Sequence, residues 1–177
     1  MKLKVTVLLS LLFILLPSVA VRAQTKSSAS AKPVRETAAE SDIRKWLDDW
    51  TKAFARKDVD AVIALYADDV IAYDVVPPLQ YVGKEAYRAD YQQFFGQYQS
   101  DLHVEVRDLH IGVRGDFAYA AGLELIGGTL KNGQKSDVWV RFTSLFRKVK
   151  GRWLDFHDHV SVPADFDTGK ALLDLKP

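Results

Sequence analysis

Several absences limit the chemistry that this chain can perform. Its 177 residues include no cysteine, so disulfides, thiolate nucleophiles and thiolate metal sites are excluded. The formal net charge is only +1, which gives no electrostatic reason to expect a nucleic acid or an anionic membrane surface as a partner. The sequence also lacks a G-x-S-x-G motif, a phosphate-binding glycine loop and a dinucleotide fingerprint. Hydrolase, kinase and Rossmann-type functions are therefore not indicated.

The first residues are typical of a secretory signal peptide. Two lysines precede an apolar run, Val7–Leu16, that is too short to span a bilayer comfortably. Val21 and Ala23 place small residues at the −3 and −1 positions of a cleavage site. We expect a signal peptide at 1–23 and an exported, periplasmic or secreted protein with no membrane association after cleavage. An uncleaved membrane anchor is the alternative.

The remaining chain reads as a short linker followed by one domain. Residues 24–38 are rich in serine, alanine and lysine without an apolar period, which predicts a flexible linker. Hydrophobic residues make up 48% of the chain, so a packed core is expected. We place the domain at 39–163 and a C-terminal tail, lying over an edge or an opening, at 164–177.

Hydrophobic periodicity predicts helices first and strands afterwards. Apolar residues recur at helical intervals over 38–56, a short helix follows Asp58, and Gly83 opens a third helix. After a short strand at 70–75, the pattern from Asp101 onward changes to alternation. Long strands are expected at 102–113, 117–127, 135–149 and 152–162. The fold class is therefore α+β, with three helices packed on a strongly curved antiparallel sheet to form a cone with an internal pocket.

Two segments resemble a known family. YADDVIAYD at 66–74 follows the short helix, and GRWLDFHDHVS at 151–161 contains the last strand. In this order and spacing, residues 40–163 resemble the SnoaL-like family of the nuclear transport factor 2-like superfamily, which includes ketosteroid isomerase. The closing segment also resembles the association domain of calcium/calmodulin-dependent protein kinase II. The resemblance implies a hydrophobic pocket and a homodimer formed through the outer sheet face, but no single activity.

Asp74 is the candidate general base. The resemblance places it at the position of the catalytic aspartate of ketosteroid isomerase, where a partly buried carboxylate removes a proton from carbon next to a carbonyl. Trp50 and Thr143 stand near the positions of that enzyme's two acidic donors, and neither is a comparable acid. This departure argues against steroid isomerase activity. A carboxylate that only caps a local loop is the structural alternative for Asp74.

One face of the predicted strand 135–149 mixes large apolar groups with an arginine. Alternation puts Trp139, Arg141 and Thr143 on that face, whereas Val138 and every second residue after it form a nearly apolar face. The mixed face fits a pocket wall or a dimer surface. Its R-x-T pattern is similar to that of SnoaL-like sequences, which implies an arginine that binds a carboxylate or an enolate. An ion pair of Arg141 with an acid such as Glu124 is the alternative.

The last strand carries an unusual number of polar groups. Alternation places His157 and His159 on one face and Asp158 on the other. Two imidazoles could bind a metal, His157 or His159 could transfer protons, or the group could be structural. Similarity to SnoaL-type cyclases implies an acid/base role for Asp158. Alternation cannot decide which face is concave, because a bulge would exchange the two.

These observations predict an exported SnoaL-like protein that binds a small, largely apolar ligand. The candidate catalytic residues are Asp74, His157 and Asp158. The candidate ligand contacts are Trp50, Tyr66, Tyr91, Trp139, Arg141, Thr143 and His159. We expect no metal, no cofactor and no nucleic acid, and a homodimer as the assembly. A cofactor-independent isomerase, cyclase or dehydratase with Asp74 as its base is one alternative, and an oligomeric scaffold is another.

Overall fold

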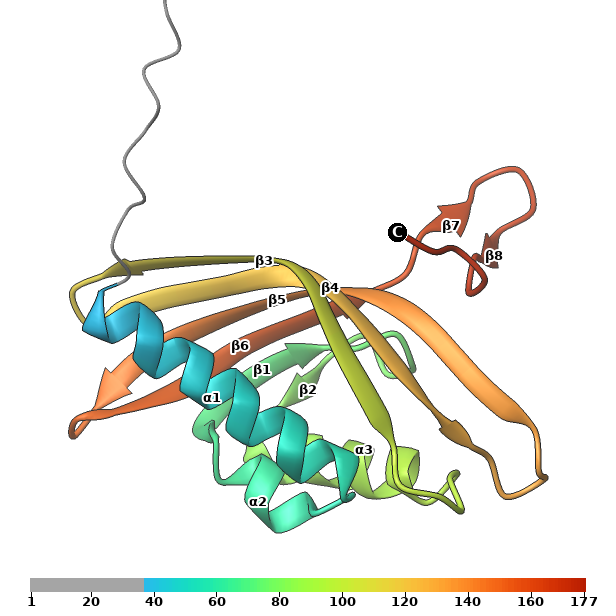
Figure 1. The fold of residues 1–177 in the computed structure, drawn as a ribbon, viewed down its shortest axis with the longest axis horizontal. Coiled ribbons are helices and arrows are strands. Elements are labelled where there is room, and N and C mark those ends of the chain that lie inside the picture. Colours follow the sequence, from blue (N-terminus) through green and yellow to red (C-terminus); the bar gives the residue numbers. More distant parts are fainter. Residues whose placement is uncertain (1–36) are drawn as a thin grey trace, which may run out of the picture. The chain divides into compact units, whose positions relative to one another are not determined.

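The computed structural model describes residues 37–177. The expected signal peptide and nearly all of the expected linker lie outside the described residues. Within residues 37–177 the chain forms three helices and one six-stranded sheet, together with a small C-terminal hairpin (Figure 1). In this part of the chain, no helix is long and apolar enough to cross a membrane.

The helices begin where the sequence supplies caps. Helix α1 (Ala38–Ala55) starts with a capping box, in which the Glu40 amide donates to Thr37 Oγ1 and the Thr37 amide donates to the Glu40 carboxylate. Helix α2 (Val59–Ile63) is capped by the Asp58 side chain, and α3 (Lys84–Phe95) follows Gly83. The buried face of α1 recurs every three or four residues, as helical geometry requires: Ile43, Trp46, Trp50 and Phe54.

The sheet is mixed rather than purely antiparallel. Its strands are β1 (Tyr66–Tyr73), β2 (Tyr81–Val82), β3 (His103–Arg114), β4 (Phe117–Thr129), β5 (Lys135–Val149) and β6 (Arg152–Ser161). They lie in the order β2-β1-β6-β5-β4-β3, and only the β1–β6 pair is parallel. The prediction of a purely antiparallel sheet is wrong for this pair, because β6 lies beside β1 and runs in the same direction. The four long strands otherwise match the predicted ranges within two residues.

The sheet bends over the helices, which all lie on its concave side (Figure 1). The bend coincides with an irregularity in β3, where the pairing shifts between Arg107 and His110 and Asp108 takes a positive φ of 50°. Opposite this point, β4 has Gly122, at which an added Cβ would lie 2.9 Å from the carbonyl oxygen of Arg107. Only glycine allows this close approach of backbone to backbone.

A second bulge lies in β6. Leu145 of β5 pairs with His157 and the next residue, Phe146, pairs with Asp155, so Phe156 has no partner on β5. The extra residue breaks the strict alternation of faces along the strand. As a result Asp155 and Asp158, which are three residues apart, are both buried, with exposed fractions of 0% and 6%.

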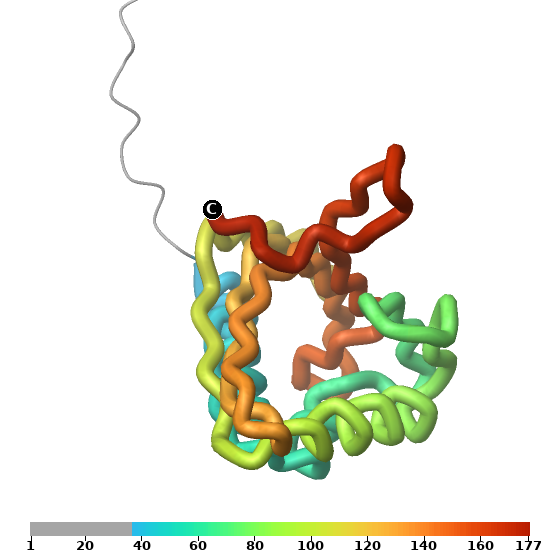
Figure 2. Tube along the Cα trace, turned by 90° about the vertical axis from the view of Figure 1, so that its right-hand side faces the viewer, coloured from blue at the N-terminus to red at the C-terminus, as the bar shows by residue number. Residues whose placement is uncertain are grey.

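The C-terminal segment lies at one end of the sheet. It contains the short strands β7 (Ala164–Asp165) and β8 (Lys170–Ala171) and then crosses from the β6 side toward β3 (Figure 2). Leu173 lines the pocket described below. The tail therefore contributes one side chain to that pocket.

Candidate functional site

A cavity of about 220 Å³ lies between the helices and the concave face of the sheet. For comparison, a cavity of about 150 Å³ accommodates benzene. Its walls are mostly aromatic and aliphatic. They come from α1 (Trp46, Leu47, Trp50, Phe54), from α3 and the turn after it (Tyr87, Tyr91, Phe94, Tyr98), and from β4 and β5 (Ile126, Val138, Val140, Phe142).

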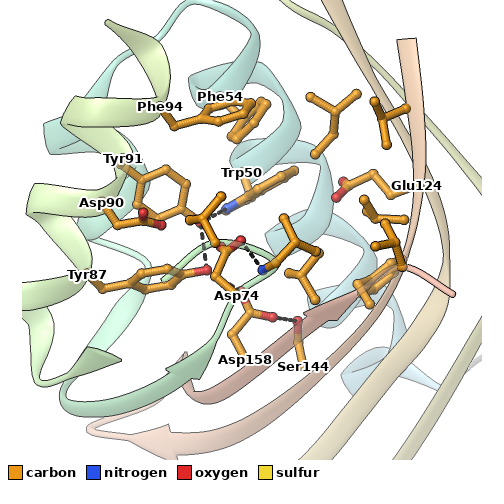
Figure 3. A pocket seen from close by; sticks show the side chains of 18 of the residues that line it. Trp50, Phe54, Asp74, Tyr87, Asp90, Tyr91, Phe94, Glu124, Ser144 and Asp158 are labelled. Carbon is orange, nitrogen blue, oxygen red and sulfur yellow. Dashed lines mark hydrogen bonds between the residues drawn. The ribbon is translucent and has the colours of Figure 1, made fainter. Parts of the chain in front are cut away.

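Three hydroxyl groups converge on the carboxyl group of Asp158, and Figure 3 shows the bond from Ser144. Tyr87 donates to Oδ2 over 2.8 Å and Tyr66 donates to the same oxygen over 3.3 Å, while Ser144 Oγ donates to Oδ1 over 3.1 Å. Burial raises the pKa of Asp158, and these donors act in the opposite direction because they stabilise its ionised form. Asp158 is thus a buried carboxyl group whose acceptor positions are largely occupied.

The tyrosines continue into a hydrogen-bonded chain. The hydroxyls of Tyr66 and Tyr91 are 2.7 Å apart, and the indole Nε1 of Trp50 donates to both, over 3.1 and 3.3 Å. Burial raises the pKa of Tyr66, Tyr87 and Tyr91 well above the ordinary tyrosine value. All three therefore stay protonated at neutral pH and remain available as hydrogen-bond donors.

Asp155 lies behind Asp158 in the core. Its Oδ1 accepts from the His157 amide over 3.0 Å, whereas its Oδ2 has no hydrogen-bond partner within residues 37–177. Burial, and then the nearby Asp158, raise the pKa of Asp155 well above the usual range. Asp155 has fewer donors than Asp158, so we assign the first proton of this pair to Asp155.

Asp74 and Asp90 form a second acidic pair at the pocket. Burial first and the nearby Asp90 second raise the pKa of Asp74 to about 7. Asp90 accepts a hydrogen bond from the Tyr81 hydroxyl over 2.8 Å, and burial raises its pKa too. Asp74 itself accepts from the amide of Val75. A group that titrates near pH 7 can either take up or release a proton under physiological conditions.

Glu124 is a pocket residue that the sequence analysis named only as an ion-pair partner of Arg141. It projects from β4 into the cavity, is 6% exposed and accepts no hydrogen bond from any described residue (Figure 3). Burial, followed by the charges of Asp158 and Asp74, raises its pKa to about 8. One indication of this position was present in the sequence: every second residue of β4 faces inward, and Glu124 follows Ala118, Ala120 and Gly122 in that series.

The structure brings five of the predicted site residues together. Trp50, Tyr66, Asp74, Tyr91 and Asp158 all line the cavity. The roles proposed for them in binding and catalysis stay predictions.

Three other candidates lie on the opposite face of the sheet, which we call the convex face. Trp139, Arg141 and Thr143 are paired with outward-facing residues of β4, and the wall of the cavity is instead the Val138–Phe146 face of the same strand. The prediction that these three residues line the pocket is wrong, because the helices cover the other, more apolar face of β5. Arg107 lies over the Trp139 ring, with 5.0 Å between the guanidinium carbon and the ring centroid.

The two histidines also lie outside the cavity. The rings of His157 and His159 pack edge-on against Tyr73, at centroid distances of 4.9 and 5.8 Å. The bulge at Phe156 explains the outcome, because it allows Asp155 to turn inward while His157 and His159 stay outside. Among residues 37–177, no group of three or more histidine and carboxylate side chains is placed to hold a metal ion.

Comparison with known proteins gives a family and a fold. The model of the SnoaL-like domain matches residues 43–165. A solved NTF2-like protein of unknown function from Pseudomonas putida KT2440 is 37% identical and has a TM-score of 0.73; the match covers 80% of this chain and 99% of that one. No curated protein matches.

Two further solved structures are similar at lower identity. One, from Xanthomonas campestris, is named for the calcium/calmodulin dependent protein kinase II association domain; it is 26% identical, with a TM-score of 0.64 and coverage of 71% of this chain and 88% of that one. The other is a ketosteroid isomerase-like protein from Erwinia carotovora atroseptica, 24% identical, with a TM-score of 0.62 and coverage of 71% and 97%.

The raised pKa of Glu124 predicts how this residue affects stability. Since the folded-state pKa lies above the unfolded value, the folded state binds the proton more tightly, and Glu124 becomes increasingly destabilising as the pH rises from about 4.5 to about 8. Replacing it with the neutral isostere, Glu124→Gln, should stabilise the domain on the order of 3 kcal/mol more at pH 9 than at pH 5. Urea unfolding at the two pH values measures this difference. Glu105→Gln, on the outer face of β3, is the control, and an equal effect of both variants would contradict the assignment.

Proposed function

The chain belongs to the SnoaL-like domain family, and we propose that it is an exported protein that binds a small, largely apolar ligand in the cavity under its curved sheet. The observation that carries this proposal is the cavity itself, which is walled by aromatic and aliphatic side chains and has its polar groups confined to a few positions. Binding sites for small molecules have this composition, in which apolar walls provide affinity and a few polar groups fix orientation. The signal peptide expected at residues 1–23 supports export.

Acid–base catalysis is a second candidate, and Asp74 is the observation that favours it. Its carboxyl group faces the cavity, and its pKa of about 7 suits proton transfer near neutral pH. In this role Asp74 would remove a proton from carbon next to a carbonyl group, and protonated Glu124 could donate a hydrogen bond to the carbonyl oxygen. The similarity to a ketosteroid isomerase-like protein supports this class of reaction. Arg141 would play no direct part, because it lies on the convex face.

We further propose that two copies associate through the convex face. Leu123, Leu125 and Trp139 lie together there on β4 and β5, with Leu125 directly opposite Trp139, and Leu145 lies farther along the same face, opposite Tyr119. Tyr119 on the same face is 41% exposed. A group of partly exposed apolar side chains on one face of a sheet is typical of a protein–protein contact. The similarity to a protein named for an association domain supports an oligomer.

A pocket-filling variant tests ligand binding. Val140 lines the cavity and is 5% exposed, so the indole of Val140→Trp should occupy the space that a ligand needs. We expect 3-phenylpropan-1-ol to raise the thermal unfolding temperature of the mature protein and to have no effect on Val140→Trp. Phe117→Trp, at a position 44% exposed on β4, is the control for added bulk. Equal shifts in all three proteins would place the binding outside the cavity.

The variant Asp74→Asn tests catalysis. If Asp74 is the base, turnover of an apolar ketone, followed by deuterium incorporation from heavy water, should fall by about 10² or more while affinity is kept. In the wild type, kcat/KM should increase through about pH 7 as Asp74 loses its proton. The control is Asp68→Asn, because the Asp68 side chain is 97% exposed. Unchanged exchange in Asp74→Asn would assign Asp74 to structure alone.

The variant Trp139→Glu tests the dimer. Trp139→Glu replaces a large apolar side chain of the convex face with a carboxylate that would have to lose its water in the interface, so we expect light scattering to show a dimer for the wild type and a monomer for the variant. Lys52→Gln on the exposed side of α1 is the control, because it also lowers the net charge by one. A wild-type monomer, or a dimer that survives Trp139→Glu, would rule out this face.

A further inference from the structure

We propose that the pocket selects a ligand with a protonated amine on an apolar body, an inference that rests on the proposed ligand-binding function. Four carboxyl groups line the cavity, from the segment after β1, α3, β4 and β6: Asp74, Asp90, Glu124 and Asp158. Among the described residues that line it, none is a lysine, an arginine or a histidine. A cation is therefore the charge that this lining can compensate, and a ligand carboxylate would meet only like charges.

Glu124 provides the specific position for the cation. Asp158 accepts three hydrogen bonds from side chains, Asp90 accepts one from Tyr81, and Asp74 accepts one from a backbone amide. Glu124 is more than nine-tenths buried and projects into the cavity, yet it has no hydrogen-bond partner among residues 37–177. The fully enclosed side-chain atoms without a partner in residues 37–177 are Trp153 Nε1 and Asp155 Oδ2, so the Glu124 oxygens are open to the cavity. Carboxyl groups inside proteins are normally hydrogen-bonded, and a donor that enters the cavity can supply this bond. An ammonium group supplies three donors and no acceptor.

The aromatic walls suit the same ligand. Trp50 and Phe54 of α1 are stacked, with their ring centroids 4.6 Å apart, and face the cavity together with Phe94 and Tyr91 of α3 (Figure 3). These rings lie across the cavity from Glu124. An aromatic face attracts a cation and also packs against an apolar ring or chain. An alkyl or aryl amine can therefore use both walls at once.

The protonation of the pocket gives the proposal a distinctive pH dependence. The titratable groups that face the cavity with Glu124 come from β1 (Tyr66), the segment after it (Asp74), α3 and its following turn (Tyr87, Asp90, Tyr91, Tyr98) and β6 (Asp158). Within residues 37–177, α1, β3 and β5 contribute no titratable side chain to the cavity wall. An ammonium ion requires an ionised carboxylate, so its binding should release a proton from this set and become tighter as the pH rises from 6 to 8.5. A neutral ligand that accepts a hydrogen bond from protonated Glu124 would show the opposite trend.

Three probes of one shape test the inference on the mature protein: 3-phenylpropylamine, 3-phenylpropan-1-ol and 3-phenylpropanoate. Calorimetric titration at pH 6 and 8.5 gives the affinity of each. We expect the amine to bind about tenfold or more tightly than the alcohol at pH 8.5 and the carboxylate to bind most weakly. Titrations in buffers with different ionisation enthalpies should show release of a proton when the amine binds.

The variant Glu124→Gln separates the role of this residue from general electrostatics. It should lose the preference for the amine and the proton release while still binding the alcohol, and the Glu105→Gln control should behave as the wild type. Alcohol binding that equals or exceeds amine binding would overturn the amine inference and leave the apolar-ligand proposal standing. Failure of all three probes to bind would overturn both. An amine preference that survives in Glu124→Gln would overturn the assignment of the cation to Glu124.

Discussion

The structure depends on the cost of removing carboxyl groups from water. Asp155, Asp158 and Glu124 are almost completely buried, and an isolated ionised carboxylate in such surroundings would oppose folding strongly. The chain meets this cost in two ways. Asp158 is surrounded by hydroxyl donors from α3, β1 and β5, whereas Asp155 and Glu124 have raised pKa values and keep a proton over much of the physiological range. The tyrosine chain thus supports the polar side of the cavity and also joins the helices to the sheet.

Much of the fold could be predicted from the sequence because its elements have strong local signals. The capping box at Thr37 and Glu40, the helical period from Ile43 to Phe54 and the alternation over 135–149 each specify an element without reference to the rest of the chain. The parallel pairing of β1 with β6 was not predicted. It joins segments about ninety residues apart, for example Tyr66 with Asp155, and no local pattern records such a pairing.

The site was harder to predict because each position depends on which face of a strand is covered. The resemblance placed Asp74 and Trp50 at the cavity, where the structure has them. Arg141 was expected there on its chemistry, although the opposite face of β5 is the more apolar one and is the one under the helices. The bulge at Phe156 could not be located from alternation, and it alone lets Asp155 and Asp158 both reach the interior. Glu124 occupies an inward position in the alternating pattern of β4, but it belongs to no motif that would mark it as functional.

The parallel pair of β1 and β6 has a consequence for how the domain folds. Strand β1 has only the two-residue β2 on its other side, so most of its backbone pairs with a strand that follows about ninety residues later. Pairings between such distant segments slow folding, because the entropy of closing the long loop is lost before the contact forms. Docking of β6 also carries Asp155 and Asp158 from water into the interior. Completion of the sheet is therefore coupled to an uptake of protons from the surrounding solvent.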